Sequence, residues 1–223
     1  MKAKGDALSG YRVRFQTYEF EGFDIHLRTL LDRNQFFDPL GEAEALGISS
    51  AQWSLFGVVW DSSQVLAHEL QTHSIENKRI LEVGCGIGLT SMMFNARHAD
   101  ITASDYHPEV GYFLAENTRL NNGDAIPYLR ADWTVIHEGL GKFDLIVGSD
   151  LLYEVQHIKQ LSSFIDRHAK PECEVVIVDP GRGNHAAFSK HMVKLGFSHE
   201  QHKPESCEYL AKPFKGNILR YCR

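Results

Sequence analysis

Apolar and polar residues alternate along residues 11–30, on both sides of Glu21-Gly22. A period of two is typical of strands that bury one face. Two such runs joined by two residues that include glycine predict a β-hairpin. A short, weakly helical stretch follows at 41–47.

Farther along, segments with helical spacing alternate with short apolar runs. Asp61 or Ser62 is a candidate cap for a helix that carries Val65, Leu66 and Leu70 at helical spacing. The runs that predict strands are 79–83, 100–105, 126–133, 143–150 and 173–180, and those that predict helices are 89–97, 107–122, 155–168 and 184–195.

Strands that alternate with helices predict βαβ units and a parallel sheet covered on both faces. Residues 197–223 contain strand-like segments without a helix between them, which favours an antiparallel strand at the end. The expected fold is α/β, a doubly wound, mostly parallel, Rossmann-like sheet with an antiparallel C-terminal strand. The only plausible boundary lies within 33–52, so we expect a hairpin extension over 1–52 and a larger domain over 53–223.

Composition narrows the class of protein. The formal charge is −6, which argues against nucleic acid as the main partner because phosphate contacts need a basic surface. No apolar run approaches the roughly 18–20 residues of a membrane span, and the start, MKAKGDALSG, has no apolar stretch of the kind that marks a signal peptide. None of the four cysteines has zinc-ligand spacing, so we expect reduced thiols, a cytoplasmic protein and no metal site.

The most informative segment is a buried strand that runs directly into Gly84, Gly86 and Gly88 and then into a helix. Glycines allow a tight turn and a close approach of a ligand to the backbone. The dinucleotide fingerprint G-x-G-x-x-G differs, because here Leu89 fills the place of its third glycine. Glu82, just before the loop, disfavours an anion and favours a cationic or amine-bearing ligand.

Two further strand ends carry polar groups. Asp105 ends the next strand, where a carboxylate can accept hydrogen bonds from ribose hydroxyls. Asp132-Trp133 ends the third strand and combines an acceptor with a flat ring, which suits an adenine. The alternative is purely structural: a tight turn without a ligand, a helix cap at Asp105 and a core residue at Trp133. Together the pieces favour adenosine with a positive centre and an amino-acid tail, which is S-adenosylmethionine.

The motif E-V-G-C-G-I-G-L with an acidic strand end resembles the class I, seven-strand S-adenosylmethionine-dependent methyltransferases. Over roughly 55–200 the chain is similar to their family-16 group, which includes protein-lysine methyltransferases. The segments that carry this resemblance are 59–63 (VWDSS), the glycine loop, 131–133 (ADW), 149–153 (SDLLY) and 179–182 (DPGR). The family usually has proline where this chain has Asp61. The resemblance implies a seven-stranded sheet and a protein substrate, with the substrate read by the hairpin and the tail.

The resemblance also implies roles for the cofactor site. Glu82 would pair with the cofactor's amino group, directly or through water, and Gly84, Gly86 and Gly88 would leave room for its tail. Asp105 would hold the ribose. The expected cofactor site also includes Trp60, Tyr106, Asp132, Trp133 and Ser149.

Asp150 and Tyr153 are the expected catalytic residues. A carboxylate at Asp150 would orient a lysine ammonium, and an aromatic wall suits such a guest. For Asp150 the alternative is an N-cap of the helix after Tyr153, and for Tyr153 and Trp60 it is core packing. Asp179 and Arg182 are expected to shape the acceptor site, or simply to form a turn with a surface arginine.

Two other residues are expected to be bystanders. His107 is predicted to be exposed at the start of a helix, and Cys85 to be a small packing residue.

The expected activity is therefore methyl transfer to a protein lysine by a monomer. The alternatives are a small amine or heterocycle as acceptor, and a scaffold that binds the cofactor without catalysis. A nicotinamide oxidoreductase is disfavoured by the loop spacing and by the lack of a Tyr-x-x-x-Lys pair.

Overall fold

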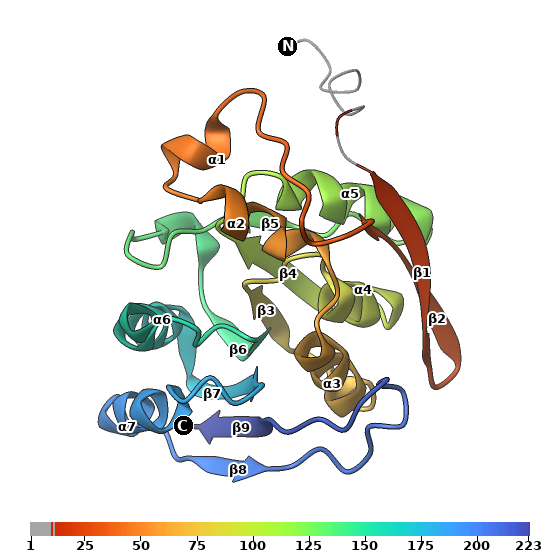
Figure 1. The fold of residues 1–223 in the computed structure, drawn as a ribbon. Coiled ribbons are helices and arrows are strands. Elements are labelled where there is room, and N and C mark those ends of the chain that lie inside the picture. Colours follow the sequence, from red (N-terminus) through yellow and green to blue (C-terminus); the bar gives the residue numbers. More distant parts are fainter. Residues whose placement is uncertain (1–9, 11) are drawn as a thin grey trace.

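A seven-stranded sheet forms the centre of the computed structural model, which describes Gly10 and residues 12–223 (Figure 1). Its strands are β3 (Arg79–Val83), β4 (Asp100–Asp105), β5 (Tyr128–Arg130), β6 (Phe143–Ser149), β7 (Ala169–Asp179), β8 (Glu200–His202) and β9 (Asn217–Cys222). Their order across the sheet is β5-β4-β3-β6-β7-β9-β8. β3 to β7 pair in parallel, whereas β9 is antiparallel to both β7 and β8. The predicted fold class is confirmed.

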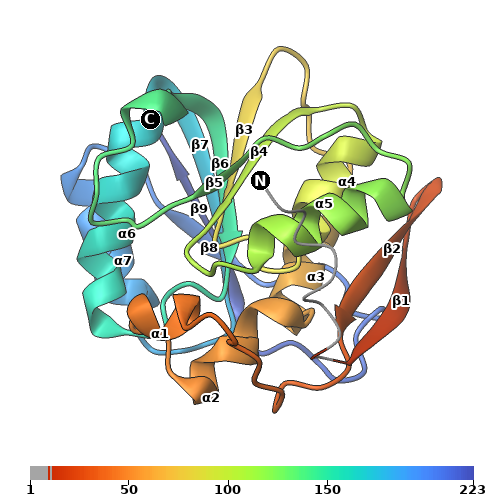
Figure 2. The same cartoon turned by 90° about the horizontal axis from the view of Figure 1, so that it is seen from above.

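Helices cover both faces of this sheet (Figure 2). One face carries α3 (Asp61–Leu70), α4 (Leu89–Ala96) and α5 (Val110–Leu120), and the other carries α6 (Val155–His168) and α7 (His185–Lys194). Successive strand residues point to opposite faces, so Ile80 joins the core under α3 and α4 while Leu81 joins the core under α6 and α7. A 3-10 turn, η3 (Glu138–Leu140), precedes β6.

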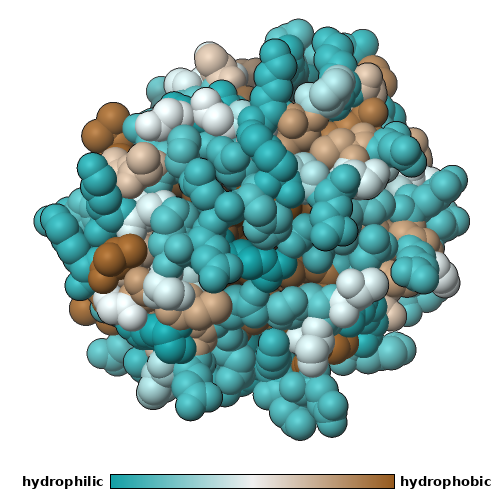
Figure 3. Space-filling model, turned by 90° about the horizontal axis from the view of Figure 1, so that it is seen from below, coloured by the Kyte–Doolittle hydropathy of each residue, from teal (hydrophilic) through white to brown (hydrophobic). Residues whose placement is uncertain are grey.

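β8 forms one edge of the sheet. All three residues of β8 are exposed. The face seen from below is mainly hydrophilic, with apolar residues in separate patches (Figure 3). Within the described residues, no helix has the length and apolar character needed to span a membrane.

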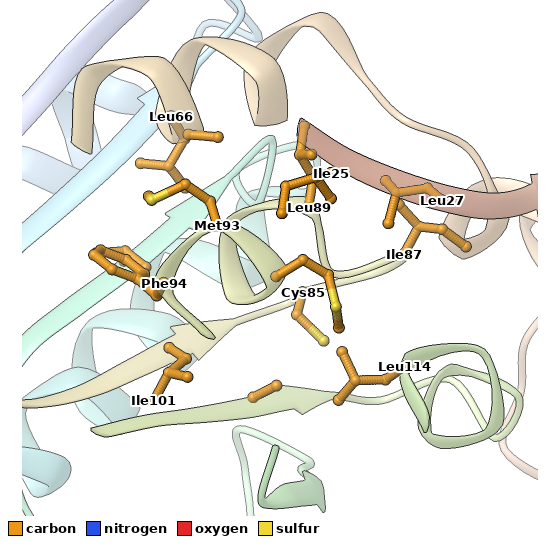
Figure 4. Close-up of a cluster of buried hydrophobic side chains, with 14 of the residues drawn as sticks. Ile25, Leu27, Leu66, Cys85, Ile87, Leu89, Met93, Phe94, Ile101 and Leu114 are labelled. Carbon is orange, nitrogen blue, oxygen red and sulfur yellow. The ribbon is translucent and has the colours of Figure 1, made fainter. Parts of the chain in front are cut away.

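The N-terminal hairpin consists of β1 (Val13–Phe20) and β2 (Phe23–Leu30), joined at Glu21-Gly22 as the alternation predicted. Residues 1–9 and Tyr11, the first residue of the predicted hairpin, lie outside the described residues. Ile25 and Leu27 of β2 point into the same core as the glycine loop and α4 (Figure 4). The hairpin is therefore packed onto the α/β body.

A segment without regular periodicity connects the hairpin to α3. It contains α1 (Glu42–Ala45), α2 (Ser50–Trp53) and the 3-10 turn η2 (Ser54–Gly57). We call residues 33–57 the connecting segment.

Most predicted elements are confirmed, and β3, β4 and α6 have the predicted bounds. β5 is shorter than predicted, and β7 begins at Ala169. The predicted cap of α3 is wrong: Trp60 is its N-cap and makes no side-chain capping bond, and Asp61 is the first helical residue.

Candidate functional site

A cavity of about 720 Å³ opens at the carboxyl ends of β3, β4, β5 and β6. In open α/β sheets ligands bind at this edge, where the strand order reverses; here the reversal lies between β3 and β6. Ten of the predicted site residues line the cavity: Trp60, Gly84, Gly86, Asp105, Tyr106, Asp132, Trp133, Ser149, Asp150 and Tyr153. Glu82 and Gly88 are not among its lining residues.

Gly84 and Gly86 form a cradle at the floor of the cavity. Their φ angles are 61° and 52°, in the region that side chains rarely adopt. A Cβ on Gly84 would lie 2.4 Å from the Leu151 side chain, and one on Gly86 would lie 3.1 Å from the Phe56 carbonyl oxygen. A side chain at either position would therefore crowd Leu151 or Phe56, so the close packing of this turn requires glycine.

Glu82 lies behind the cradle, 2% exposed. Its Oε2 accepts hydrogen bonds from the backbone N–H of Ser91, at 2.8 Å, and from the Ser91 hydroxyl. Burial raises the pKa of Glu82 to about 7, against the opposing effect of the Ser91 hydrogen bonds. The carboxylate thus holds the first turn of α4 against the end of β3.

Asp105 connects the ends of β3 and β4. Its Oδ2 accepts from the Gly86 N–H at 2.8 Å and its Oδ1 from the His107 N–H at 2.9 Å. Burial raises the pKa of Asp105, and these amide bonds oppose the rise. Since a carboxylate has about four lone-pair sites, acceptor capacity remains toward the cavity.

His107 is the residue that sequence reasoning placed wrongly. It is 5% exposed, and its ring stacks on Phe56 at a centroid distance of 4.1 Å and meets Trp53 edge-on. Burial lowers the pKa of His107 to about 3, so the ring is neutral. The expectation of exposure failed because the covering rings come from the connecting segment, about fifty residues earlier in the chain.

Asp132 and Trp133 line the side of the cavity near β5. Asp132 Oδ1 accepts from the N–H of Thr134 at 2.8 Å and from its hydroxyl at 2.6 Å. The Trp133 ring meets His157 at 5.4 Å, nearly perpendicular. Both residues are held by contacts within the protein and line the cavity side by side in the chain.

Asp150 follows β6 and has a left-handed backbone, with φ of 53°. Both of its carboxylate oxygens accept from Arg182, at 2.9 Å and 2.8 Å. Asp150 does not cap α6, because Glu154 is the N-cap residue of that helix. Asp179 is 1% exposed and accepts from the Gly181 N–H, which forms the turn that presents Arg182.

Two aromatic residues flank the opening. Trp60 donates through Nε1 to the Leu55 carbonyl at 3.0 Å. Tyr153 is 50% exposed and meets the His157 ring edge-on at 4.6 Å. Partial burial and the nearby carboxylate of Asp105 raise the pKa of Tyr153 to about 12, so its hydroxyl stays protonated at neutral pH.

The connecting segment forms the outer wall of the cavity, which the sequence did not indicate. Its lining residues include Leu46, Ile48, Gln52 and Phe56. The Tyr106 hydroxyl donates to the Leu46 carbonyl at 3.0 Å, and Gln52 Nε2 lies 3.5 Å from Glu154 Oε1. The weakly helical stretch predicted at 41–47 contains α1, but its pattern did not indicate that the segment lines a cavity.

The cradle and its surroundings fit a nucleoside cofactor with a compact tail. Gly84 and Gly86 bring backbone without side chains to the cavity, Asp105 adds a carboxylate, and Asp132 with Trp133 adds an acceptor and an aromatic ring. The described part of the chain contains no group of three or more His, Cys, Asp or Glu side chains placed to hold a metal ion. Burial and neighbouring carboxylates raise the pKa of Cys85 well above its usual range, which suits the predicted packing role.

Comparisons with known proteins agree with this geometry. A family model described as lysine methyltransferase matches residues 45–195. The histidine protein methyltransferase 1 homolog of Dictyostelium discoideum is 34% identical over 117 residues, which cover 49% of this chain and 38% of that protein. The electron transfer flavoprotein beta subunit lysine methyltransferase of Mus musculus is 28% identical over 175 residues, which cover 77% of this chain and 65% of the relative. The chain thus spans less than two thirds of the length of both relatives.

Solved structures support the fold. The ribosomal protein L11 methylase of Lactobacillus delbrueckii subsp. bulgaricus superposes with a TM-score of 0.59 at 18% identity, covering 73% of this chain and 78% of that chain. The 16S rRNA N2 G1207 methyltransferase of T. Thermophilus superposes with a TM-score of 0.62 at 13% identity, covering 95% of this chain and 50% of its own. At these identities the likeness concerns the fold.

Proposed function

The chain belongs to the lysine methyltransferase family, and from this we propose that it transfers a methyl group from S-adenosylmethionine to a lysine side chain of a protein. The observation that carries the proposal is the cavity at the carboxyl ends of β3 to β6, where the glycine cradle, Asp105 and Asp150 meet. The relatives named above act, by their names, on proteins.

The cofactor side of the cavity would be formed by the floor and one flank. Gly84 and Gly86 would accept the methionine tail, and Asp105 the ribose hydroxyls. Asp132 and Trp133 would bracket the adenine, while Trp60, Tyr106 and Ser149 complete the wall. We assign Glu82 and Gly88 a positioning role, because Glu82 binds Ser91 and Gly88 is the N-cap of α4.

The acceptor side needs no metal or strong acid. S-adenosylmethionine supplies an activated methyl group on a positively charged sulfur. The protein's part is to orient a neutral amine in line with it and to exclude water. Asp150 would orient the lysine nitrogen before it loses its proton to solvent, and Tyr153 would wall its channel.

The cysteines and the net charge bear on the partners and the compartment of the protein. We propose a protein substrate, no nucleic acid and a monomeric enzyme in the cytoplasm. All four cysteines are free thiols, which suits a reducing compartment. The net charge of −6 argues against nucleic acid as the main partner, because phosphate contacts favour basic proteins.

Labelled S-adenosylmethionine incubated with the protein and a cell extract tests the proposal. We expect label in macromolecules and methyl-lysine after acid hydrolysis. Label in small molecules alone would point to a free amine as acceptor. Methyl-histidine in the hydrolysate would show that the acceptor side chain is histidine and not lysine.

Paired variants test whether the labelling depends on the proposed cofactor site. Asp105→Ala should remove the labelling, because Asp105 ties the two cofactor loops together. Asp100→Ala is the control, since Asp100 lies at the opposite end of the same strand with its side chain 61% exposed. Wild-type protein that binds the cofactor and labels nothing would identify a scaffold.

A further inference from the structure

The carboxylate assigned to the acceptor already has a cation on it. Arg182 Nε donates to Asp150 Oδ1 at 2.9 Å, and Nη2 donates to Oδ2 at 2.8 Å. This two-point geometry is the strong form of an arginine–carboxylate pair. Both side chains line the cavity. An incoming ammonium therefore meets a carboxylate whose two oxygens are engaged.

The two partners differ in how firmly the fold holds them. The Asp150 side chain is 11% exposed, and its backbone N–H donates to the Val178 carbonyl at 2.9 Å. Arg182 is 45% exposed and stands between Gly181 and Gly183, whose φ angles are 101° and 89°. Neither glycine has an atom within 4 Å of a built Cβ. Glycines in open space absorb changes of φ and ψ at low cost, so Arg182 is the partner that can leave.

We propose that Arg182 is a tethered cation which occupies the acceptor carboxylate and is displaced by the acceptor lysine, so that it selects amines carried on a docked protein over free amines. This inference rests on the proposed function. The guanidinium takes the place of the acceptor's ammonium until a substrate docks, and it then swings toward solvent on its glycine-flanked loop.

Competition explains the selection. A tethered group has a high effective concentration, of millimolar order or above for short linkers. A free amine must displace the Arg182 guanidinium from Asp150, and its only compensation is the single ion pair that it forms with the carboxylate. A lysine on a docked protein is itself presented intramolecularly, and contacts remote from the lysine supply the free energy of displacement. Arg182 thus gives specificity by weakening the binding of free amines more than that of a lysine on a docked protein.

Binding of n-butylammonium, a mimic of the lysine side chain, tests this without turnover. Its affinity would be measured by NMR titration with S-adenosylhomocysteine present. We expect Arg182→Gln to bind it at least tenfold more tightly than wild type, and Asp150→Asn combined with Arg182→Gln to lose that gain. The matched control is Arg119→Gln, which removes an exposed ion pair to Glu116 on α5 and should leave the affinity unchanged.

Several outcomes would overturn the inference. Equal affinity in wild type and Arg182→Gln would do so, as would absence of binding to both. If Arg182→Gln fails to fold, Arg182→Lys replaces it, because lysine keeps the charge but loses the two-point geometry. An affinity of Arg182→Lys for n-butylammonium no higher than that of wild type would equally contradict the inference. Lack of methyl transfer to extract proteins would contradict the proposed function and leave this binding comparison intact.

Discussion

Glu82 shows how strongly burial modifies the acidic residues at the strand ends. It is 2% exposed, with Ser91 as its hydrogen-bond partner, and its pKa is raised to about 7. Burial also raises the pKa of Asp105. The charge on Glu82 therefore depends on pH in the neutral range.

This shift has a defined sign for stability. Between the ordinary pKa of 4.5 and about 7, unfolded Glu82 releases its proton while folded Glu82 keeps it. The folded state then binds more protons, so the free energy of unfolding falls as pH rises through this window, by up to about 1.4 kcal/mol per pH unit. We expect Glu82→Gln to lose this component, as measured by urea unfolding between pH 4.5 and 7.5.

The control for this measurement is Glu200→Gln on the exposed strand β8, which should keep the wild-type slope. A Glu82→Gln profile parallel to wild type would show that Glu82 is ionised in the folded protein across this range.

At the scale of elements, Asn117 of α5 and the C-cap residue Asn121 serve as partners for the open edge of the hairpin. Asn117 Oδ1 accepts from the Arg28 N–H at 2.7 Å, and Asn121 Oδ1 accepts from the His26 N–H at 2.8 Å. Each amide group also donates to the carbonyl of the same strand residue. The spacings of the two pairs agree. The four residues from Asn117 to Asn121 correspond to a helical rise of about 6 Å, and the two residues from His26 to Arg28 to about 6.7 Å along a strand. The side chains thus satisfy an edge that otherwise invites another strand.

Asn117→Ala should destabilise the protein by about 2–4 kcal/mol. Asn117 is fully buried and also donates to the Ile87 carbonyl of the glycine loop, so its loss leaves several backbone groups unpaired, at about 1–3 kcal/mol for each group that stays dry. Asn121→Ala should cost about 1 kcal/mol or less, because water can reach the half-buried edge. Urea unfolding of both variants measures the difference, and equal costs would refute the role of burial.

The elements differ in how far the sequence predicts them. Segments such as β3, β4 and α6 match the structure residue for residue, because a strand buried on both faces leaves a short apolar run and a half-buried helix leaves apolar residues at helical spacing. In the connecting segment only the weakly helical stretch at 41–47, which contains α1, was predicted; α2 and η2 were not, and α2 buries the single residue Trp53. The Asp150–Arg182 pair joins residues 32 positions apart. Such contacts depend on the tertiary arrangement, which no local pattern encodes.

At the scale of the whole molecule, the hairpin supports the cavity from a distance. Leu30 of β2 packs on Gly57, where a Cβ would lie 2.4 Å from its side chain. Next to Gly57, Phe56 stacks on His107 at the cavity wall. The hairpin, the connecting segment and the cofactor loops therefore form one packed series, although the hairpin precedes the span matched by the family model.

A chain that begins at Asp32 should consequently lose cooperative unfolding in urea and binding of S-adenosylhomocysteine. It would lack four buried apolar side chains, Phe20, Ile25, Leu27 and Leu30. At about 2 kcal/mol each, their burial is comparable with the whole net stability of a typical domain, about 5–15 kcal/mol.

Point variants give the matched comparison. Leu27→Ala should lower the free energy of unfolding by about 3 kcal/mol. Phe15→Ala, at a position 66% exposed on β1, should lower it by less than about 0.5 kcal/mol. Cooperative unfolding and undiminished binding by the shortened chain would instead mean that the boundary predicted within 33–52 separates two independent units, and that the shared core contributes little to the site.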